Sequence, residues 1–197
     1  MKNPCPGLWL ADIQEHTKHL TSLTNNLITL SRMEEERTRL QMIDFPFSDV
    51  VEETVQSFQA LARTQNKTFE TLIQPMISLY GDEKSLTQLV SILLDNAMKY
   101  STPKGEISLR LEKAGNNVKL SVYNTADYIN REQLPHLFDR FYRTDKSRSS
   151  RTGGYGLGLS IAAAVVNTHK GKITATTQDE HSLLITVTLP LKAQGRK

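Results

Sequence analysis

The middle of the chain alternates apolar and polar residues in two short segments on either side of a turn. Residues 107–111 (ISLRL) and 118–122 (VKLSV) carry the alternation, and Gly-Asn-Asn at 115–117 separates them. A period of two gives each strand one apolar face, so these segments predict an antiparallel hairpin. Residues 173–175 and 183–189 repeat the pattern and predict two further strands. The fold must therefore cover the apolar face of a sheet.

Three helices are predicted to form that cover. One spans residues 48–63, with Ser48 as its expected N-cap. Another spans residues 83–100, and the last spans 159–169 behind the glycine-rich loop at 153–158. The apolar stripe of the second helix consists of Leu86, Leu89, Val90, Leu93 and Leu94. Three helices with a mostly antiparallel sheet predict a two-layer α+β domain.

The N-terminal part follows a different period. No Gly or Pro occurs from Leu8 to about Arg39, and apolar residues recur every seven positions, as at Ile13, Leu20 and Leu27. This pattern predicts one long isolated helix with a narrow apolar seam. Because such a seam cannot bury itself, we expect a partner helix from the parent protein or from a second copy.

Charge and composition exclude several classes of function. The 24 Lys and Arg against 21 Asp and Glu give a formal net charge of +3, which is too small to favour nucleic acid or an anionic membrane as a partner. The single cysteine, Cys5, cannot form an internal disulfide, and no Cys/His cluster has the spacing of a zinc site. No stretch approaches the ~18 consecutive apolar residues of a membrane span. We expect a soluble chain without a structural metal and without a nucleic-acid partner.

One face of the helix at 83–100 carries candidate binding groups. Asn96, Lys99 and Tyr100 lie at positions i, i+3 and i+4, so they share a face. An amide oxygen can bind Mg²⁺, a lysine can contact phosphate and a tyrosine can flank a base. A solvated polar face explains the same spacing, so both interpretations remain open.

The glycine-rich loop at 153–158 (GGYGLG) precedes a helix directly. Missing side chains allow backbone amides and the positive end of the helix dipole to approach a phosphate. A tight turn needs glycines too, so the loop alone is a weak signal. It lacks the Gly-Lys-Ser/Thr ending of a Walker loop, and no strand leads straight into it as in a Rossmann fingerprint.

Three segments in this order resemble the sensor histidine kinases of two-component systems. LLDNAMKYS (93–101) resembles their N box, FDRFYR (138–143) their F box, and TGGYGLGLSIA (152–162) their second glycine box. GDEKSLTQL (81–89) resembles the lead-in to the N box, and LITLSRMEEE (27–36) the end of the second dimerisation helix. The F box separates these kinases from the gyrase, MutL-type and chaperone ATPases of the same superfamily.

The resemblance implies a Bergerat-type fold, a mixed and mostly antiparallel sheet with helices on one face, in which Mg²⁺ and ATP lie between the N-box helix and a mobile lid. It assigns residues 1–43 to the second helix of the dimerisation bundle and residues 44–197 to the ATP-binding catalytic domain. In the N box, Asn96 matches the magnesium ligand, and Asp95 matches the acidic neighbour that orients the ion or its water.

The other implied nucleotide contacts lie in the N box, the F box and the second glycine box. They are Lys99, Tyr100, Arg140, Arg143, Gly154, Gly156, Leu157 and Gly158. Guanidinium groups suit phosphate oxygens, although surface ion pairs account for the two arginines equally well. The aromatic residues Phe138, Phe141 and Tyr142 are expected to pack rather than to bind nucleotide.

The family's first glycine box departs from its usual D-x-G-x-G pattern. It falls on Asn-Thr-Ala-Asp-Tyr at 124–128, so all three signature residues differ. Asn124 can still accept a hydrogen bond from the adenine amino group, but without charge it should discriminate less strongly. Ala126 and Tyr128 fill the room in which glycine backbone approaches the base. Either the site is reshaped around ATP or binding is weakened, and the intact phosphate side favours reshaping.

The phosphoacceptor motif H-E-x-x-T-P is missing. The histidines are His16, His19, His136, His169 and His181, and none lies in that context. The resemblance therefore implies a kinase that transfers the ATP γ-phosphate to a histidine outside this chain. Its implied partners are a second copy, joined through the helical bundle, and a response regulator, and its implied location is the cytoplasmic part of a membrane-anchored sensor.

Two other functions are alternatives to a kinase. A non-catalytic module of the same fold would bind a nucleotide or a partner protein without phosphoryl transfer, as the altered first glycine box allows. An ATP-driven clamp of the gyrase or MutL type would need a transducer domain after the lid, and we do not expect one.

Overall fold

The computed structural model describes residue 17, residues 40–143 and residues 156–192. The predictions for the long N-terminal helix and its seam, for residues 144–155 of the lid expected at roughly 142–155, and for Gly154 lie outside the described residues.

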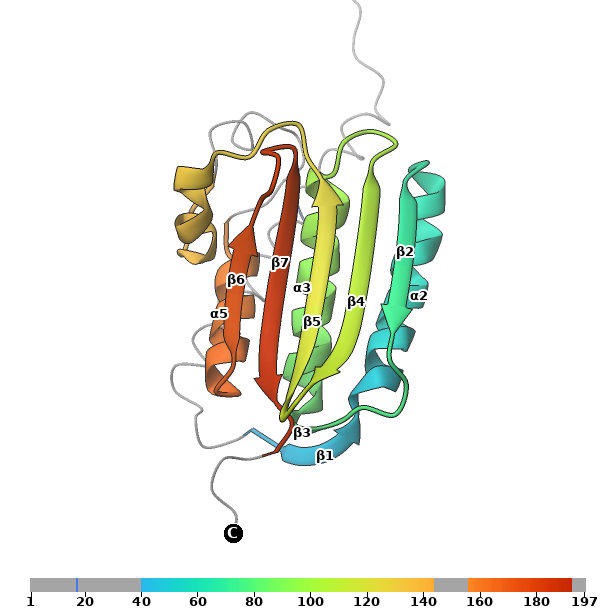
Figure 1. The fold of residues 1–197 in the computed structure, drawn as a ribbon, viewed down its shortest axis with the longest axis vertical. Helices are drawn as coiled ribbons and strands as arrows, with labels where there is room; N and C mark the ends of the chain where they lie inside the picture. The colour runs from blue at the N-terminus through green and yellow to red at the C-terminus, as the bar shows by residue number, and fades with distance from the viewer. Residues whose placement is uncertain (1–16, 18–39, 144–155, 193–197) are drawn as a thin grey trace, which may run out of the picture.

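A five-stranded sheet forms one layer of the domain (Figure 1). Its strands, in spatial order, are β2 (Thr68–Ile73), β4 (Glu106–Ala114), β5 (Asn117–Thr125), β7 (Ser182–Pro190) and β6 (Lys172–Thr176). Only β2 and β4 pair in parallel, and the other neighbours are antiparallel. A separate two-stranded sheet pairs β1 (Met42–Pro46) with β3 (Ser78–Asp82).

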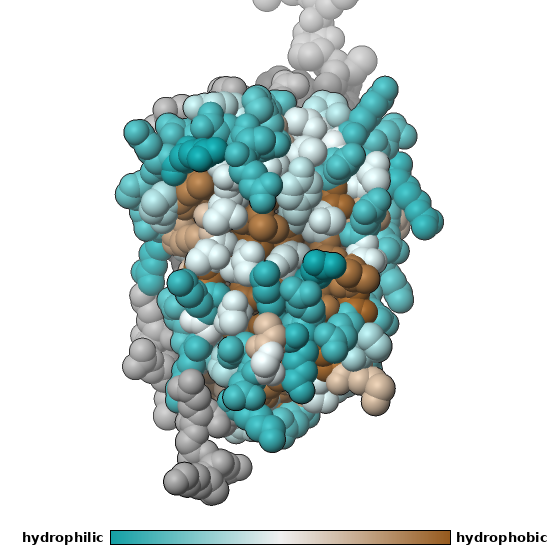
Figure 2. All heavy atoms as spheres, viewed as in Figure 1, coloured by the Kyte–Doolittle hydropathy of each residue, from teal (hydrophilic) through white to brown (hydrophobic). Residues whose placement is uncertain are grey.

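The helices form the second layer and lie behind the sheet in Figure 1. They are α2 (Phe47–Thr64), α3 (Glu83–Tyr100) and α5 (Gly158–Thr168), and a 3₁₀ helix, η1 (Arg131–Phe138), lies beside the β6 edge. The opposite face of the sheet bears mixed polar and apolar residues (Figure 2). This arrangement confirms the prediction of a two-layer α+β domain with helices on one face.

The core lies between the two layers and follows from the sequence periods. The alternating apolar residues of β4, β5 and β7 point toward the helices, and the predicted stripe of α3 is buried against them. The largest fully buried side chains are Phe47, Leu79, Leu86, Leu89, Leu93, Leu94, Ile107, Leu109, Leu111, Leu120, Leu157 and Ile161. Burying side chains of this size contributes roughly 1.5–3 kcal/mol each, so the stripe fixes α3 firmly on the sheet.

The prediction for the start of α2 was wrong in one respect. The helix begins at Phe47, and its N-terminus has no side-chain cap. The Ser48 hydroxyl instead donates to the carbonyl oxygen of Gln74 at 2.7 Å and accepts from the N–H of Ile77 at 3.0 Å. Ser48 therefore fastens the connection between β2 and β3 to the helix, because a buried hydroxyl needs partners and this loop supplies both.

The C-terminal end of α3 and the last residues of β5 lie at one end of the domain, the upper end in Figure 1. The first turn of α5 lies lower, beside the middle of α3, where Gly158 is next to Ile92. The β1–β3 sheet lies at the opposite end. Within the described residues, no helix is long and apolar enough to cross a membrane.

Candidate functional site

The last turns of α3 place four candidate residues at the upper end of the domain. Asn96 is half-buried, whereas Asp95, Lys99 and Tyr100 are exposed. The Lys99 ammonium lies 2.6 Å from the Asp95 carboxylate, one helical turn away. Asp95 therefore contacts Lys99, and because both side chains are open to water this ion pair stabilises the helix only slightly.

Asn96 lies one helical turn beyond the part of α3 that packs on the beginning of α5. A Cβ atom placed on Gly158 would lie 3.5 Å from Cγ2 of Ile92, so the first turn of α5 packs on Ile92. Asn96 follows Ile92 by four residues and shares its helix face. Within the described part of the chain, the Asn96 side-chain amide makes no hydrogen bond. Its oxygen is therefore available to a ligand between α3 and α5.

The first turn of α5 offers backbone amides to the same region. Its N-cap is the buried Leu157, which provides no side-chain cap, and the first turn holds no acidic residue. Ser160 does not serve as a cap, because its hydroxyl donates to the Leu157 carbonyl at 2.8 Å. The N–H groups of this turn have no partner within the helix and lie at the positive end of its dipole, which suits an anion.

The F box and the second glycine box are in direct backbone contact. The Phe141 N–H donates to the Gly156 carbonyl at 3.0 Å. Gly156 has a φ of +72°, and a Cβ atom there would lie 2.5 Å from the Tyr142 carbonyl oxygen. Only glycine satisfies both the left-handed backbone and this close approach.

Of the three aromatic side chains in the F box, two pack against other residues as predicted and one does not. Phe138 packs against the core, and the Tyr142 ring lies 5.7 Å from that of His136. The prediction that Phe141 packs was wrong, since 62% of it is exposed. Its φ of +61° and its hydrogen bond to the glycine box turn this ring outward.

The two F-box arginines differ in burial. Arg140 is exposed and Arg143 is half-buried, and each already has a noncovalent partner. Both flank the contact between Phe141 and Gly156, so the structure brings them next to the second glycine box.

Asn124 lies at the end of β5 on the face that points toward the helices, and only 2% of it is exposed. Its Nδ2 donates to the Thr125 carbonyl at 2.9 Å, which leaves Oδ1 as the acceptor. The Thr125 hydroxyl is hydrogen-bonded to that of Thr102 at 3.0 Å and accepts from the N–H of Glu106 at 3.0 Å. These contacts fasten the end of β5 to the segment that follows α3.

The rest of the altered first glycine box is attached to the turn between β6 and β7. The N–H of the buried Ala126 donates to the His181 carbonyl at 2.7 Å, and His181 Nδ1 donates to the Asp127 carbonyl at 2.7 Å. Tyr128 is half exposed, with its ring 6.5 Å from the His181 ring. Ala126 and Tyr128 therefore belong to an ordered connection, which glycines would leave less constrained.

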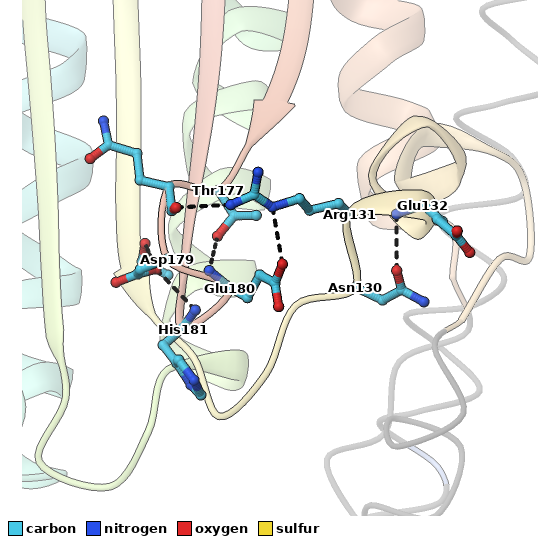
Figure 3. A network of polar contacts seen from close by, with 9 residues as sticks. Asn130, Arg131, Glu132, Thr177, Asp179, Glu180 and His181 are labelled. Atoms are coloured by element: carbon cyan, nitrogen blue, oxygen red, sulfur yellow. Dashed lines mark hydrogen bonds and ion pairs between the residues drawn. The ribbon is translucent and has the colours of Figure 1, made fainter.

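A polar network extends this attachment toward η1 (Figure 3). Arg131 contacts the Glu180 carboxylate at 3.1 Å and donates to the Gln178 carbonyl at 2.9 Å. The Ile129 N–H donates to the Glu180 carbonyl at 2.7 Å. Sequence reasoning missed this network, because its two halves lie about fifty residues apart without a shared motif.

A second group of polar contacts that the sequence did not reveal lies at the opposite end of the domain. The buried His169 donates from Nδ1 to the Val165 carbonyl at 2.8 Å, and its Nε2 accepts from the N–H of Asp82 at 3.0 Å. Burial lowers the pKa of His169, outweighing its Val165 hydrogen bond and the Asp82 charge. Burial alone would raise the pKa of Asp82, but hydrogen bonds from Ser85 and Gln41 lower it on balance.

Comparison with known proteins identifies the family. Residues 81–193 match the family described as histidine kinase-, DNA gyrase B-, and HSP90-like ATPase. Over 192 residues, 97% of the chain, the sequence is 32% identical to the sensor protein DltS of Streptococcus agalactiae. The chain belongs to the sensor histidine kinase family. It covers 48% of DltS, so this kinase chain spans about half the length of the curated relatives that it matches.

Two solved histidine kinases share the fold of this sensor-kinase chain. Full-length ShkA in complex with AMPPNP has a TM-score of 0.79 at 19% identity, with 98% of this chain and 41% of that chain covered. ThkA in complex with the response regulator TrrA has a TM-score of 0.75 at 21% identity, with 98% and 55% covered. These structures confirm the Bergerat-type fold. The family model confirms an ATPase domain of the kind that binds nucleotide.

Proposed function

We propose that this chain is the ATP-binding catalytic part of a two-component sensor histidine kinase, and that it passes the ATP γ-phosphate to a histidine outside residues 1–197. One observation carries the proposal: the α3 face that bears Asn96 runs from the uncapped start of α5, which packs on Ile92, toward the end of the domain where β5 ends. The buried Asn124 amide lies in the last residues of β5. An amide oxygen can bind a metal ion, backbone amides can bind a phosphate chain, and a buried acceptor can bind the amino group of a base.

The residues present fit a magnesium ion whose other ligands come from the nucleotide. Within the described ranges, no group of three or more His, Cys, Asp or Glu could hold a metal ion by itself. Asn96 supplies one hard oxygen ligand, and Mg²⁺ often combines few protein ligands with phosphate oxygens and water. When bound, the ion neutralises phosphate charge, and Asp95 would orient it or its water.

Each remaining candidate has a role in this proposal. Lys99 exchanges its exposed Asp95 partner for phosphate, and Tyr100 flanks the base. Asn124 accepts from the adenine amino group through Oδ1. The amides of the second glycine box, from Gly154 through Gly156 and Leu157 to Gly158, receive phosphate oxygens, and the guanidinium groups of Arg140 and Arg143 neutralise further phosphate charge.

Catalysis in this arrangement consists mainly of positioning and charge neutralisation. The acceptor histidine comes from the parent protein. We assign residues 1–43 to the dimerisation bundle and residues 44–197 to the catalytic domain. The partners are then a second copy of the parent protein and a response regulator, and the domain lies on the cytoplasmic side of a membrane-anchored sensor. The complex of ThkA with TrrA supports the proposed regulator partner.

The altered first glycine box favours one alternative function. Ala126 is buried and hydrogen-bonded to His181, so the connection after β5 is already closed by protein contacts. A module of this kind could bind a partner protein without phosphoryl transfer. Calorimetry that detects no binding of ATP in the presence of Mg²⁺ would favour this alternative over the kinase.

The proposal is tested by calorimetric titration of ATP with and without Mg²⁺. Asn96→Ala removes the proposed ligand oxygen and should abolish most of the magnesium-dependent gain in affinity. Asn167→Ala, an exposed position at the far end of α5, is the matched control and should bind like the wild type. Equal affinity of wild type and Asn96→Ala would refute the assignment of Asn96. For the transfer step, the full-length parent incubated with γ-labelled ATP should become labelled on histidine.

A further inference from the structure

The C-terminal end of α3, which carries Lys99 and Tyr100, is held from outside the helix by one lysine. Lys67 is a half-buried residue in the turn between α2 and β2, and its ammonium donates to the Met98 carbonyl. It also donates to the Ser101 hydroxyl at 2.7 Å and to the Ser101 carbonyl at 3.4 Å. The carbonyls at this end lack partners within the helix and carry the negative end of its dipole, so an ammonium suits them.

The Lys67 backbone is itself fixed on both sides. Its N–H donates to the Ala62 carbonyl at 2.9 Å, which closes the end of α2. The next N–H, that of Thr68, donates to the Gly105 carbonyl at 3.0 Å, in the turn beyond α3. The backbone from which the Lys67 side chain extends is therefore held between the end of α2 and the turn beyond α3. Burial lowers the pKa of Lys67, as expected for an ammonium partly removed from water.

We propose that Lys67 is a positioning residue for nucleotide binding, because it fixes the last turn of α3 and thereby the places where Lys99 and Tyr100 meet the ligand. The inference rests on the proposed function. Lys67 acts only through the helix. Functional side chains must be held to about 0.5 Å by their supporting contacts, and a helix end without its cap frays.

The affinity of the full 197-residue chain for ATP in the presence of Mg²⁺ tests this role. Lys67→Met keeps the side-chain length and removes the ammonium, so we expect affinity to fall about fivefold or more, the lower range of coupling between sites. Lys113→Met removes the same charge from an exposed position at the far end of β4. This control should bind within about twofold of the wild type, because distant exposed charges are screened. Lys67→Arg keeps a cationic donor and should recover most of the loss.

Hydrogen exchange without nucleotide separates this role from that of a simple cap. The Ser101 N–H is bonded to the Ala97 carbonyl at 3.0 Å and should exchange faster in Lys67→Met. Faster exchange with unchanged affinity would overturn the proposal, because Lys67 would then support only the helix. If the wild type binds no ATP, the proposed function fails and this inference with it. If Lys67→Met does not fold, Lys67→Gln is judged by the same criteria.

Discussion

Replacing Gly156 by alanine should weaken the junction between the F box and the second glycine box. The new methyl group would lie 2.5 Å from the Tyr142 carbonyl oxygen and 2.8 Å from the carbonyl carbon of Phe141. The left-handed backbone alone costs a residue other than glycine about 1 kcal/mol. Moving backbone out of such a contact costs about 1–3 kcal/mol more. We therefore expect Gly156→Ala to lower the free energy of unfolding by about 2–4 kcal/mol, a large part of a typical total of about 5–15 kcal/mol.

Gly115→Ala is the matched control for this measurement. Gly115 has a similar φ of +61°, but nothing lies within 4 Å of an added Cβ atom. Gly115→Ala should lower the free energy of unfolding only by the backbone contribution of about 1 kcal/mol. Urea denaturation of the wild type and both variants gives the two losses in free energy. Equal losses would show that Gly156 does not approach the F box closely, and would refute the contact between the two boxes.

The buried residues His169 and Asn124 each lead to one further prediction. Protonating His169 removes the acceptor that the Asp82 N–H uses, and burial lowers the pKa of His169. As pH falls below about 6.5, His169 therefore binds a proton in the unfolded chain before it does so in the folded chain. The free energy of unfolding declines in this range by up to about 1.4 kcal/mol per pH unit, until His169 also protonates in the folded state. Urea midpoints between pH 5 and 8 should show this decline, and a decline that is unchanged in His169→Asn would contradict the assignment. Asn124→Asp restores a charged acceptor and should raise the ratio of ATP to GTP affinity. An unchanged ratio would show that Asn124 does not read the base.

Local sequence signals predicted α3 and the β4–β5 hairpin because their determinants are close together in the chain. The α3 stripe follows a helical period between clear end signals, and Asp82 caps the helix through the N–H of Ser85 at 2.9 Å. The hairpin needs only alternation and a glycine turn. These elements carry Asn96 and Asn124, so their part of the candidate site could be predicted from the sequence.

The features that the sequence did not reveal depend on distant partners. β2 is a short edge strand with a mostly exposed pattern, and it pairs in parallel with β4 beyond the whole of α3. The Ser101 contact of Lys67 spans 34 residues, and the contact between His169 and Asp82 spans 87. A lone lysine or histidine carries no sign of such a partner, since lysines are mostly solvated and histidines occur both exposed and buried.

The most direct test of the central claim is hydrogen exchange on the wild-type chain with and without Mg²⁺ and ATP. Binding at the proposed site should slow exchange in the last turns of α3, at residues 124–126 and in the first turn of α5. The β1–β3 sheet lies at the opposite end of the domain and should keep its exchange rates. Slowed exchange confined to the β1–β3 end, or no change anywhere in the presence of saturating nucleotide, would contradict a nucleotide site between α3 and α5.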